Sequence, residues 1–437
     1  MTTLTFPLSR IEGHARVEIE VRDGEVLSTR FQAMEKRGFT LIVKGVPAEQ
    51  MPVIVPRICG VCSTAHHVAA VKALEDAYGV TPPPLADTIR ELLLLGQLIQ
   101  NQATSLFVFT MPDRLGVESI FHISGEEADK NVQFNIARRA LMVRQLGTDL
   151  ITLAGGQFIH PVKAVVGGVS SGVDPGKAAA FQQRISEALP TACDLVDTYW
   201  DISIRMKDRI GTWGDDQPAY YITSTSAVKP NYDSSQVRVM APDGSDAGTF
   251  TPGQFYDATT FEETDYSYAG RTSFNNGVMR ANSLARANMT QSLGTPLADG
   301  FLKRLWAEFG NPAHPILLFD LCRGIELVYA LERAAELLSQ PLNEEDTDAP
   351  YSPRDGEGWG LVEAPRGPLI HHYVVEGGKI AVGEFIIPTV HNMLAIERAL
   401  RVAAERYITE DSVNLELERA VGRVVRAFDP CIACATH

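Results

Sequence analysis

The sequence predicts a mainly α-helical protein of the α+β class, in which a bundle of long helices carries small peripheral β-hairpins. Residues 15–27 alternate between apolar and polar around Asp23-Gly24, and Asp243-Gly244 is a second turn of the same kind, as expected of tight β-hairpins. Elsewhere apolar residues recur at helical spacing, near residues 84–109, 127–154, 177–208, 295–309, 315–340, 391–407 and 412–427.

The chain divides by composition into four segments of one unit. Residues 1–56 form an N-terminal hairpin segment, and residues 57–209 a helical core in which Ser63 can cap a helix that ends near Gly79. Residues 210–290 are rich in Gly, Ser, Thr, Asp and Tyr, so we predict a folded β and loop insertion. Residues 291–437 complete the helical core. The acidic run from Asn343 to Asp348 is expected to be a solvated loop.

Composition excludes several classes of protein. At 437 residues with 45% hydrophobic and 21% charged residues, the chain is typical of a large globular protein. Its net charge of -15 argues against nucleic-acid binding. The first ten residues lack the apolar core of a signal peptide, and no apolar run approaches the roughly 20 residues of a membrane span. We expect a soluble, cytoplasmic protein, although export with a signal-bearing partner stays open.

Six cysteines are too few for a disulfide scaffold, and Cys193 and Cys322 are expected to be buried core thiols. The other four form two Cys-x-x-Cys pairs at opposite ends of the chain, Cys59 with Cys62 and Cys431 with Cys434. If the fold brings the pairs together, four thiolates converge on a site for a soft transition metal.

Three other uses of these cysteines compete with that interpretation. A zinc ribbon is disfavoured because its ligand pairs lie much closer in sequence, although a structural zinc site of another kind stays open. A dithiol redox motif needs one pair in a βαβ context. A four-cysteine iron–sulfur cluster remains possible by ligand count.

The residues beside the cysteines favour thiolates. Cys62 lies at the N-terminus of the helix opened by Ser63, where the helix dipole stabilises negative charge, and Arg57 could add positive charge. His66 lies one helical turn after Cys62, so it could donate a hydrogen bond to that sulfur, or be an ordinary core residue. Asp429-Pro430 ends the last helix and turns the chain into the second pair.

Two segments resemble the signature motifs of the large subunit of nickel–iron hydrogenases: Arg57-Ile-Cys59-Gly-Val-Cys62 with His66, and Asp429-Pro-Cys431-Ile-Ala-Cys434-Ala-Thr-His437. Shorter matches follow the order of the family along the whole chain. They are Ser9-Arg-Ile-Glu12-Gly-His14, Arg37-Gly-Phe39, Gly155-Gly156 with His160-Pro161, Glu363-Ala-Pro-Arg366-Gly367 and Ile387-Pro388-Thr389.

The resemblance implies a nickel ion held by all four cysteines. Cys59 and Cys431 would be terminal ligands, and Cys62 and Cys434 would bridge to an iron that carries carbon monoxide and cyanide. The residues expected around this centre are Arg366 over the metals, Pro388 and Thr389 along the cyanide pocket, and His66 and Asp429 beside the cysteines.

Heterolytic cleavage of H2 needs a Lewis acid and a nearby base. By the resemblance, a terminal thiolate such as Cys431, or Arg366, would be that base, and Glu12 would relay the proton onward. The alternatives are structural: an ion pair of Glu12 with Arg10 or Arg16, and of Arg366 with Glu363 or an aspartate.

The sequence departs from the family at three positions. His437 and the backbone carbonyl of Phe385 match ligands of a magnesium or second iron ion near the C-terminus, but Thr40 replaces a glutamate ligand, which weakens a hard-cation site. Glu35 lies nearby in a different register. Gln102 and Val108 stand where related sequences often have histidines, so we expect an altered proton network.

All paired cysteines are used at one site, so electrons must leave through another chain. The resemblance implies an iron–sulfur small subunit that packs on an extensive apolar interface, with further NAD(P)- or deazaflavin-linked subunits. The ending at His437 resembles the processed form of the family or a gene without the C-terminal extension. The Cys-Ala-Thr-His ending and Pro388-Thr-Val-His391-Asn392 resemble the cytoplasmic, cofactor-coupled branch more than the membrane-bound uptake enzymes. Alternatives are a hydrogen sensor with low turnover and the quinone-module subunit of respiratory complex I, which lacks both cysteine pairs.

Overall fold

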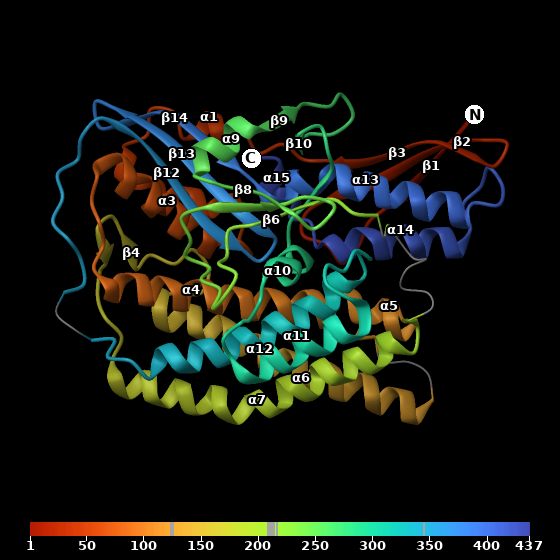
Figure 1. Ribbon diagram of the computed structural model, residues 1–437, viewed down its shortest axis with the longest axis horizontal. Coiled ribbons are helices and arrows are strands. Elements are labelled where there is room, and N and C mark those ends of the chain that lie inside the picture. Colours follow the sequence, from red (N-terminus) through yellow and green to blue (C-terminus); the bar gives the residue numbers. More distant parts are fainter. Residues whose placement is uncertain (123–125, 208–214, 216, 344–345) are drawn as a thin grey trace.

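The protein has two layers, a bundle of long helices below and a layer of strands and shorter helices above (Figure 1). The computed structural model describes residues 1–122, 126–207, 215, 217–343 and 346–437. The bundle consists of α4 (Pro84–Ala103), α5 (Met111–Leu115), α6 (Glu127–Gly155), α7 (Pro175–Ile204), α11 (Pro296–Phe309) and α12 (Leu318–Leu338). These helices confirm the helical segments predicted from periodicity, and together with the strands they confirm the α+β class.

Helix α4 lies on the side of the bundle that faces the upper layer (Figure 1) and packs against α6 and α12. It continues through a π-helical segment, Thr104–Thr110, into α5. The run Pro84–Leu115 is long and apolar enough to cross a membrane, but 83% of its most apolar window is buried inside the protein. The apolar sequence of α4 is therefore explained by its place in the core.

The upper layer begins with the antiparallel sheet of β1 (Thr2–Pro7), β2 (Ala15–Arg22) and β3 (Glu25–Ala33). The predicted hairpin is confirmed, since β2 and β3 meet at a turn in which Asp23 and Gly24 have positive φ angles of 52° and 77°. The same layer holds the helices α1 (Phe39–Ile42), α2 (Met51–Ile54), α3 (Ser63–Tyr78), α13 (Pro388–Tyr407), α14 (Leu415–Phe428) and α15 (Ile432–Ala435).

The segment predicted as a mixed insertion contains short strands and two helices, and residues 210–214 and 216 of it lie outside the described residues. Strands β6 (Tyr220–Thr223), β7 (Val237–Met240), β8 (Asp246–Phe250) and β11 (Met279–Arg280) form one sheet, and β9 (Thr259–Glu262) pairs with β10 (Arg271–Phe274). The second predicted hairpin is confirmed, with Gly244 at φ 86° between β7 and β8. The helices are α9 (Pro252–Ala258) and α10 (Ser283–Met289), and a further short pair elsewhere is β4 (Ala164–Val165) with β5 (Gly168–Val169).

A buried three-stranded sheet was not predicted from the sequence. It consists of β12 (Gly356–Ala364), β13 (Gly367–Glu376) and β14 (Lys379–Ile386). Helix α3 packs directly on β12 because glycines remove side chains from the contact: a Cβ at Gly358 would lie 2.2 Å from the Ala73 carbonyl oxygen, and one at Gly360 2.0 Å from that of Ala69. This close packing holds the first cysteine pair against the strand that leads to Arg366.

The start of α3 differs from the prediction. The helix begins at Ser63, and Cys62 occupies the N-cap position without a side-chain cap. The Ser63 hydroxyl instead donates to the Gly60 carbonyl, across the turn that carries the first pair. The predicted end is confirmed, since Gly79 follows the helix with φ 66°.

Candidate metal centre

The two cysteine pairs meet in the protein interior, as predicted. The first pair follows a 3₁₀ turn, Val55–Ile58, and leads into α3. In the second pair, Cys431 is the N-cap of α15 and Cys434 lies within that helix. The Cys431 sulfur lies 3.4 Å from that of Cys59, 3.7 Å from that of Cys62 and 2.8 Å from that of Cys434. All four residues are buried, and none forms a disulfide.

This arrangement fits a metal ion. The four sulfurs lie within 4.8 Å of one another, and a four-coordinate ion with metal–sulfur bonds of about 2.3 Å holds its ligands roughly 3.8 Å apart. Among the residues that the structure describes, this is the one set of three or more His, Cys, Asp or Glu side chains placed to share an ion.

The electrostatics of the four sulfurs also favour a cation. Hydrogen bonding with Cys431 and Cys434 holds the pKa of Cys62 well below its usual value. Burial, in contrast, raises the pKa of Cys431 and that of Cys434 well above it. Four ionised thiolates in a buried pocket are stable only around a compensating positive charge.

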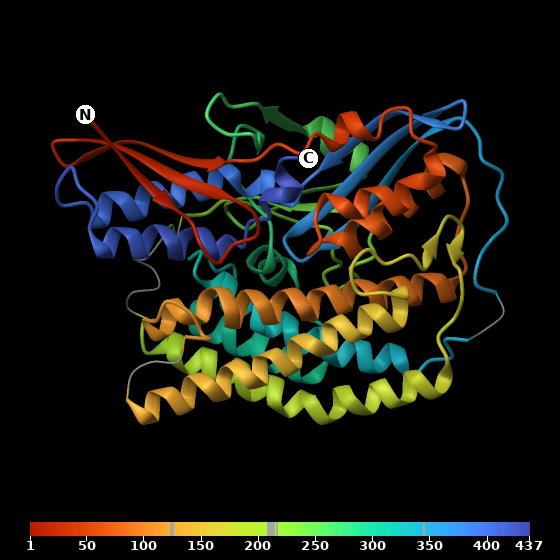
Figure 2. The ribbon, with the colours of Figure 1, turned by 180° about the vertical axis from the view of Figure 1, so that it is seen from behind.

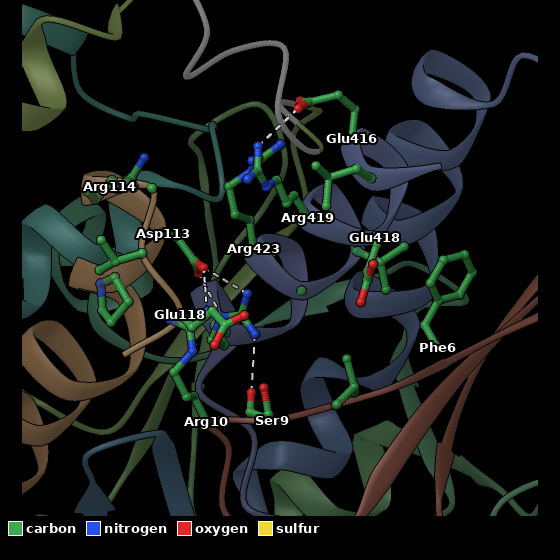
Figure 3. A pocket seen from close by; sticks show the side chains of 18 of the residues that line it. Phe6, Ser9, Arg10, Asp113, Arg114, Glu118, Glu416, Glu418, Arg419 and Arg423 are labelled. Atoms are coloured by element: carbon green, nitrogen blue, oxygen red, sulfur yellow. Dashed lines mark hydrogen bonds and ion pairs between the residues drawn. The ribbon is translucent and has the colours of Figure 1, made fainter. Parts of the chain in front are cut away.

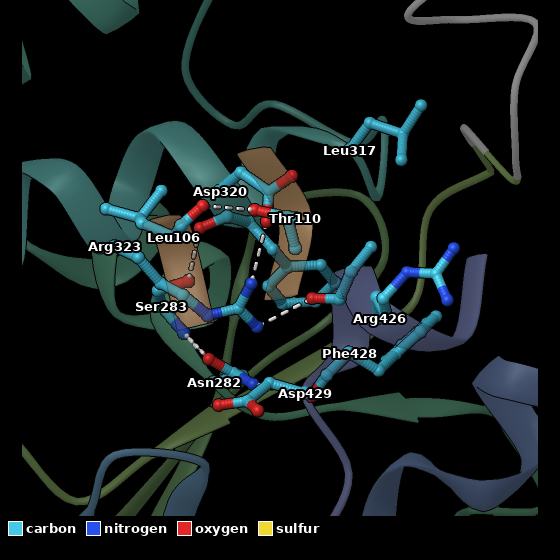
Figure 4. Close-up of polar contacts among 12 residues, drawn as sticks. Leu106, Thr110, Asn282, Ser283, Leu317, Asp320, Arg323, Arg426, Phe428 and Asp429 are labelled. Carbon is cyan, nitrogen blue, oxygen red and sulfur yellow. Dashed lines mark hydrogen bonds and ion pairs between the residues drawn. The ribbon is translucent and has the colours of Figure 1, made fainter. Parts of the chain in front are cut away.

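Buried side chains from other parts of the chain bind the end of α14, directly before the second cysteine pair (Figure 4). The last helical carbonyls are bound by side chains from elsewhere in the chain: Arg323 Nη2 donates to the Ala427 oxygen at 2.6 Å, and Asn282 Nδ2 to the Phe428 oxygen at 2.9 Å. Asn282 itself has φ 91°, a conformation that costs energy for a residue with a Cβ. Asp429 then adopts φ 47°, and Pro430 directs the chain away from the helix axis.

Glu12 contacts the second pair through both its backbone and its side chain. Residues 12 and 431 form a parallel β-bridge, and the Ile432 amide donates to the Glu12 carbonyl at 3.2 Å. The Glu12 carboxylate accepts from the Cys431 thiol at 3.1 Å and from the Ala433 amide at 3.0 Å. Burial, followed by the charge of Cys59, raises the pKa of Glu12.

The structural alternative for Glu12 is wrong. Arg10 binds Asp113 at 2.6 Å, and Arg16 binds Glu18 at 2.8 Å, so neither arginine forms an ion pair with Glu12. The carboxylate is therefore directed at the sulfur of Cys431.

Arg366 supplies the positive charge nearest the sulfurs. Its Nη1 atom donates to the Cys62 sulfur at 3.3 Å, and its Nη2 atom pairs with Asp429 Oδ1 at 3.0 Å. The alternative of a pair with an aspartate is therefore also correct, whereas Glu363 pairs with Arg286 instead. Arg57, expected to add charge here, is exposed and donates to the Val53 carbonyl.

His66 is buried beside the sulfurs, but its partner differs from the predicted one. Its Nε2 atom lies 3.4 Å from the sulfur of Cys434, not that of Cys62, because this turn of α3 faces the second pair. Its Nδ1 atom lies 2.9 Å from His371 Nε2 on β13.

A small cavity lies over the sulfurs of Cys62, Cys431 and Cys434. The residues that complete its lining are mostly apolar: Ala364, Pro365, Leu369, Ile387, Pro388 and Thr389, with His66 and Arg366. The Thr389 hydroxyl accepts a hydrogen bond from the Cys431 amide at 3.1 Å. The structure thus brings Pro388 and Thr389 to the centre, as predicted.

The residues predicted to bind a second metal ion near the C-terminus are only partly brought together. The His437 ring packs edge-on against Phe385 with centroids 5.3 Å apart, and its Nδ1 atom donates to the Cys434 carbonyl at 2.8 Å. Thr40 is exposed on α1, and Glu35 forms an ion pair with His14.

Gln102, where an altered network was expected, belongs to a buried polar network beside the centre whose other contacts were not predicted. Asn101 Nδ2 donates to Asp429 Oδ2 at 3.1 Å and to the Gln102 side-chain oxygen at 3.3 Å. Gln102 then donates to Glu326 at 2.5 Å, and Glu326 pairs with Arg286 at 2.6 Å. Polar residues inside the apolar helical patterns of α4 and α12 were the signal that could have revealed it.

A larger hollow lies away from the sulfurs, between the N-terminal segment and α14 (Figure 3). Three of its arginines pair with acidic residues of the lining: Arg10 and Arg426 both bind Asp113, at 2.6 and 2.7 Å, and Arg419 binds Glu416 at 3.3 Å. None of the described residues that line it is a cysteine or histidine. The hollow is therefore separate from the metal centre.

The two unpaired cysteines lie in the helical core. Cys322 on α12 is buried, and burial raises its pKa well above the usual value. Cys193 on α7 is only partly buried, so the prediction of a buried thiol is correct for Cys322 and only partly so for Cys193.

Comparison with known proteins gives a consistent result. The family model for nickel-dependent hydrogenase matches residues 37–139 and 219–437, and a model described as HoxL-like matches residues 5–35. The vhu-type F420-non-reducing hydrogenase of Methanococcus voltae has a subunit that is 32% identical over 91% of this chain and 97% of its own length. The beta subunit of the NAD-reducing hydrogenase HoxS of Cupriavidus necator is 29% identical over 99% of this chain and 93% of that protein.

Solved structures show the same fold. An NAD+-reducing NiFe-hydrogenase in the H2-reduced state superposes with a TM-score of 0.91 and 29% identity, and covers all of both chains. The NiFeSe hydrogenase of D. vulgaris Hildenborough in the oxidised state gives a TM-score of 0.81 at 23% identity, again over both whole chains.

Proposed function

The chain belongs to the nickel-dependent hydrogenase family and is a hydrogenase large subunit; from this premise we propose how its residues cleave H2 and where protons and electrons leave. The observation that carries the proposal is the meeting of four buried cysteines with one carboxylate and one guanidinium, Glu12 and Arg366, each in contact with a sulfur. When bound there, a nickel–iron pair supplies the Lewis acid at which H2 is polarised.

Cys431 is the base that first accepts the proton. Burial would lower the pKa of Arg366, but Asp429 and the cysteine sulfurs raise it well above its usual range. Arg366 therefore stays a cation that orients and stabilises charge, whereas a thiolate at Cys431 can accept a proton. In this proposal the four cysteines would hold the metals, with Cys59 and Cys431 as the terminal ligands and Cys62 and Cys434 as the ligands that both metals would share.

Glu12 takes the proton next. Its carboxylate oxygen lies 3.1 Å from the Cys431 sulfur, within the reach required for direct transfer. The Ala433 amide fixes the same oxygen at 3.0 Å, so the carboxylate is held toward the sulfur. Glu12 is only partly buried, which gives the proton a way to the surface.

The cavity over the sulfurs suits small diatomic ligands on the iron, because it is small and offers both apolar side chains and a few hydrogen-bonding groups. Carbon monoxide and cyanide would lie among its apolar side chains, with the Thr389 hydroxyl and the Arg366 guanidinium as the polar groups within the lining. His66 and Asp429 support this pocket by their contacts with Cys434 and Arg366.

A magnesium or second iron ion near His437 is a weaker part of the proposal. It would use His437 and the Phe385 carbonyl, without a carboxylate at position 40. We expect low affinity, and metal analysis after dialysis tests it: magnesium or extra iron retained at one equivalent per chain would show a tight site.

Electrons leave toward an iron–sulfur subunit that covers the first cysteine pair. Gly60 and Val61, between the two cysteines, are exposed, so this turn brings the first cysteine pair close to the surface. Hydrogen bonds connect two neighbouring segments to residues on either side of this turn. The His160 amide donates to the Ser63 hydroxyl at 3.4 Å, and the Arg37 side chain donates to the Ile58 carbonyl at 2.9 Å.

This turn and the segments around it expose six large apolar side chains. They are Leu41, Ile42, Val53, Val61, Ile159 and Val162. Exposed apolar clusters of this kind are typical of subunit interfaces. The face continues along α6, which crosses the side of the bundle seen from behind (Figure 2) and exposes Phe134, Leu141 and Met142.

The partner is tested by one substitution at this face. Replacing Ile159 with Asp places a charge in the proposed interface, and we expect the iron–sulfur subunit to be lost on purification. Val228→Asp, on a different exposed loop, is the matched control. Co-purification of the partner with Ile159→Asp would contradict the proposed face.

We further propose a cytoplasmic enzyme whose electrons reach a soluble cofactor through NAD(P)- or deazaflavin-linked subunits. Similarity to a subunit of an NAD-reducing hydrogenase supports the nicotinamide acceptor, whereas relatives of the F420-non-reducing type give no support to a deazaflavin acceptor. Reduction of NAD+, NADP+ or F420 by H2 in the purified complex tests the acceptor, and cell fractionation tests the location.

The decisive experiment is an infrared spectrum of the purified complex with metal analysis and an H2-uptake assay. Carbon monoxide and cyanide bands with one nickel per chain support the proposal. Zinc alone, or a nickel-replete protein without those bands, would reject the dinuclear centre. Bands with very low turnover and a signalling partner would instead indicate a hydrogen sensor.

A further inference from the structure

A chain of three buried side chains leads away from the sulfur of Cys434. His66 Nε2 lies 3.4 Å from that sulfur, His66 Nδ1 lies 2.9 Å from His371 Nε2, and His371 Nδ1 lies 2.6 Å from the Tyr373 hydroxyl. His66, His371 and Tyr373 are all fully buried. These hydrogen bonds join α3 to alternate residues of β13, on the face of the strand that points toward the cysteines.

The direction of these hydrogen bonds is fixed by the sulfur at one end. A metal-bound cysteine is a thiolate, which accepts hydrogen bonds and cannot donate them. His66 Nε2 must therefore carry a hydrogen. In a neutral imidazole the other nitrogen is then an acceptor, so His66 Nδ1 accepts from His371 Nε2. His371 Nδ1 is an acceptor in turn, and it accepts from the Tyr373 hydroxyl.

The opposite direction of these hydrogen bonds requires a charged imidazolium. If Tyr373 accepted from His371, His371 Nε2 would be an acceptor, and His66 would need hydrogens on both nitrogens. Burial opposes that charge, since both imidazoles are fully enclosed by the protein. The hydroxyl of Tyr373 has His371 as its partner among the described residues.

We propose that Tyr373 and His371 are positioning residues that set the tautomer of His66 and so aim a hydrogen-bond donor at the bridging sulfur of Cys434. Consecutive hydrogen bonds of one direction polarise one another, so the hydroxyl strengthens a bond that it does not touch. A donor on a thiolate draws electron density from the sulfur and hence from the iron that it bridges. This inference rests on the proposed dinuclear centre.

The test is Tyr373→Phe in the holoenzyme. The substitution removes one oxygen and keeps the ring, which packs edge-on against Phe385 with centroids 6.4 Å apart. The bond from His66 to Cys434 weakens, and the sulfur donates more electron density to the iron. We expect the iron carbonyl band to move to lower wavenumber, at full nickel content, and turnover to fall roughly 10-fold, as for other partners of metal ligands.

Matched variants distinguish an electronic effect on the iron from a general loss of side-chain packing. Tyr329→Phe removes another buried hydroxyl, which donates to the Pro230 carbonyl far from the sulfurs in sequence, and should leave the band unmoved. His371→Gln keeps an amide donor for His66 and should move the band less than His371→Phe, which keeps the volume and removes the donor.

Each result distinguishes this inference from the proposed function. No carbonyl band in the unsubstituted protein would reject the dinuclear centre itself. A band that is present there and unmoved in Tyr373→Phe, or moved equally in Tyr329→Phe, would overturn the role of Tyr373 alone.

Discussion

Replacing Glu12 with Gln tests the proton route most directly. The substitution keeps the shape of the side chain, and the amide oxygen can still accept from the Ala433 amide, now 3.0 Å from the carboxylate. What disappears is the ability to take a proton from Cys431 at 3.1 Å. A positioned acid or base contributes about 10²- to 10⁴-fold to rate, which corresponds to about 3 to 5 kcal/mol in the barrier.

The fold should tolerate this change. Burial and the charge of Cys59 raise the pKa of Glu12, so the ionised carboxylate is less stable in the folded protein than in the unfolded chain. A neutral amide removes that cost at neutral pH, and stability should hold or rise slightly. The loss of rate then reflects the missing proton acceptor.

The assay is H2 uptake with an artificial electron acceptor, expressed per nickel, beside the melting temperature. Glu35→Gln is the control because Glu35 is an acidic residue of the same N-terminal region that pairs with His14 and does not contact the sulfurs. A Glu12→Gln enzyme that turns over at the unsubstituted rate per nickel would refute the relay.

Three further predictions concern assembly of the centre. Asn282→Ala should destabilise the fold by about 1 to 3 kcal/mol, because the buried Phe428 carbonyl loses its partner, and nickel retention during purification should fall with it. Gly358→Val should cost at least about 3 kcal/mol in denaturant unfolding, since even a Cβ would lie 2.2 Å from the Ala73 oxygen; a normal midpoint would contradict this packing. Removing the metal should lower the melting temperature, since four buried cysteines then lose their shared cation, and an unchanged transition on full removal would show that the ion does not stabilise the fold.

Local patterns in the sequence predicted most of the helices and both hairpins. Each depends on residues close in sequence, such as Asp23 and Gly24 at the first turn. The sheet of β12–β14 was not predicted, because β13 is buried on both faces. Its sequence therefore lacks the alternation of apolar and polar residues by which a half-exposed strand is recognised. The glycines of β12 were visible, but their purpose depends on α3, which lies almost 300 residues earlier.

The site was predictable only as far as its ligands carry a recognisable spacing. The four cysteines could be named because Cys-x-x-Cys is a local pattern with a chemical meaning. The residues that orient them are scattered: Asn282 and Arg323 bind the carbonyls before Asp429, and neither has a local signature. The partner of His66 was mistaken for the same reason, since a helical turn identifies neighbours within α3 and says nothing of the chain that returns from the other end.

The contact between Glu12 and Cys431 links metal assembly to proton transfer. The β-bridge that joins residues 12 and 431 fixes the backbone of the terminal cysteine, and the same residue supplies the carboxylate that faces its sulfur. The approach is close enough that a Cβ on Gly13 would lie 2.7 Å from that of Ile432, and Gly13 has φ 81°. In the proposed mechanism this one strand contact both closes the four-sulfur site and positions the acceptor, so a chain that binds its metals would have its proton route in place.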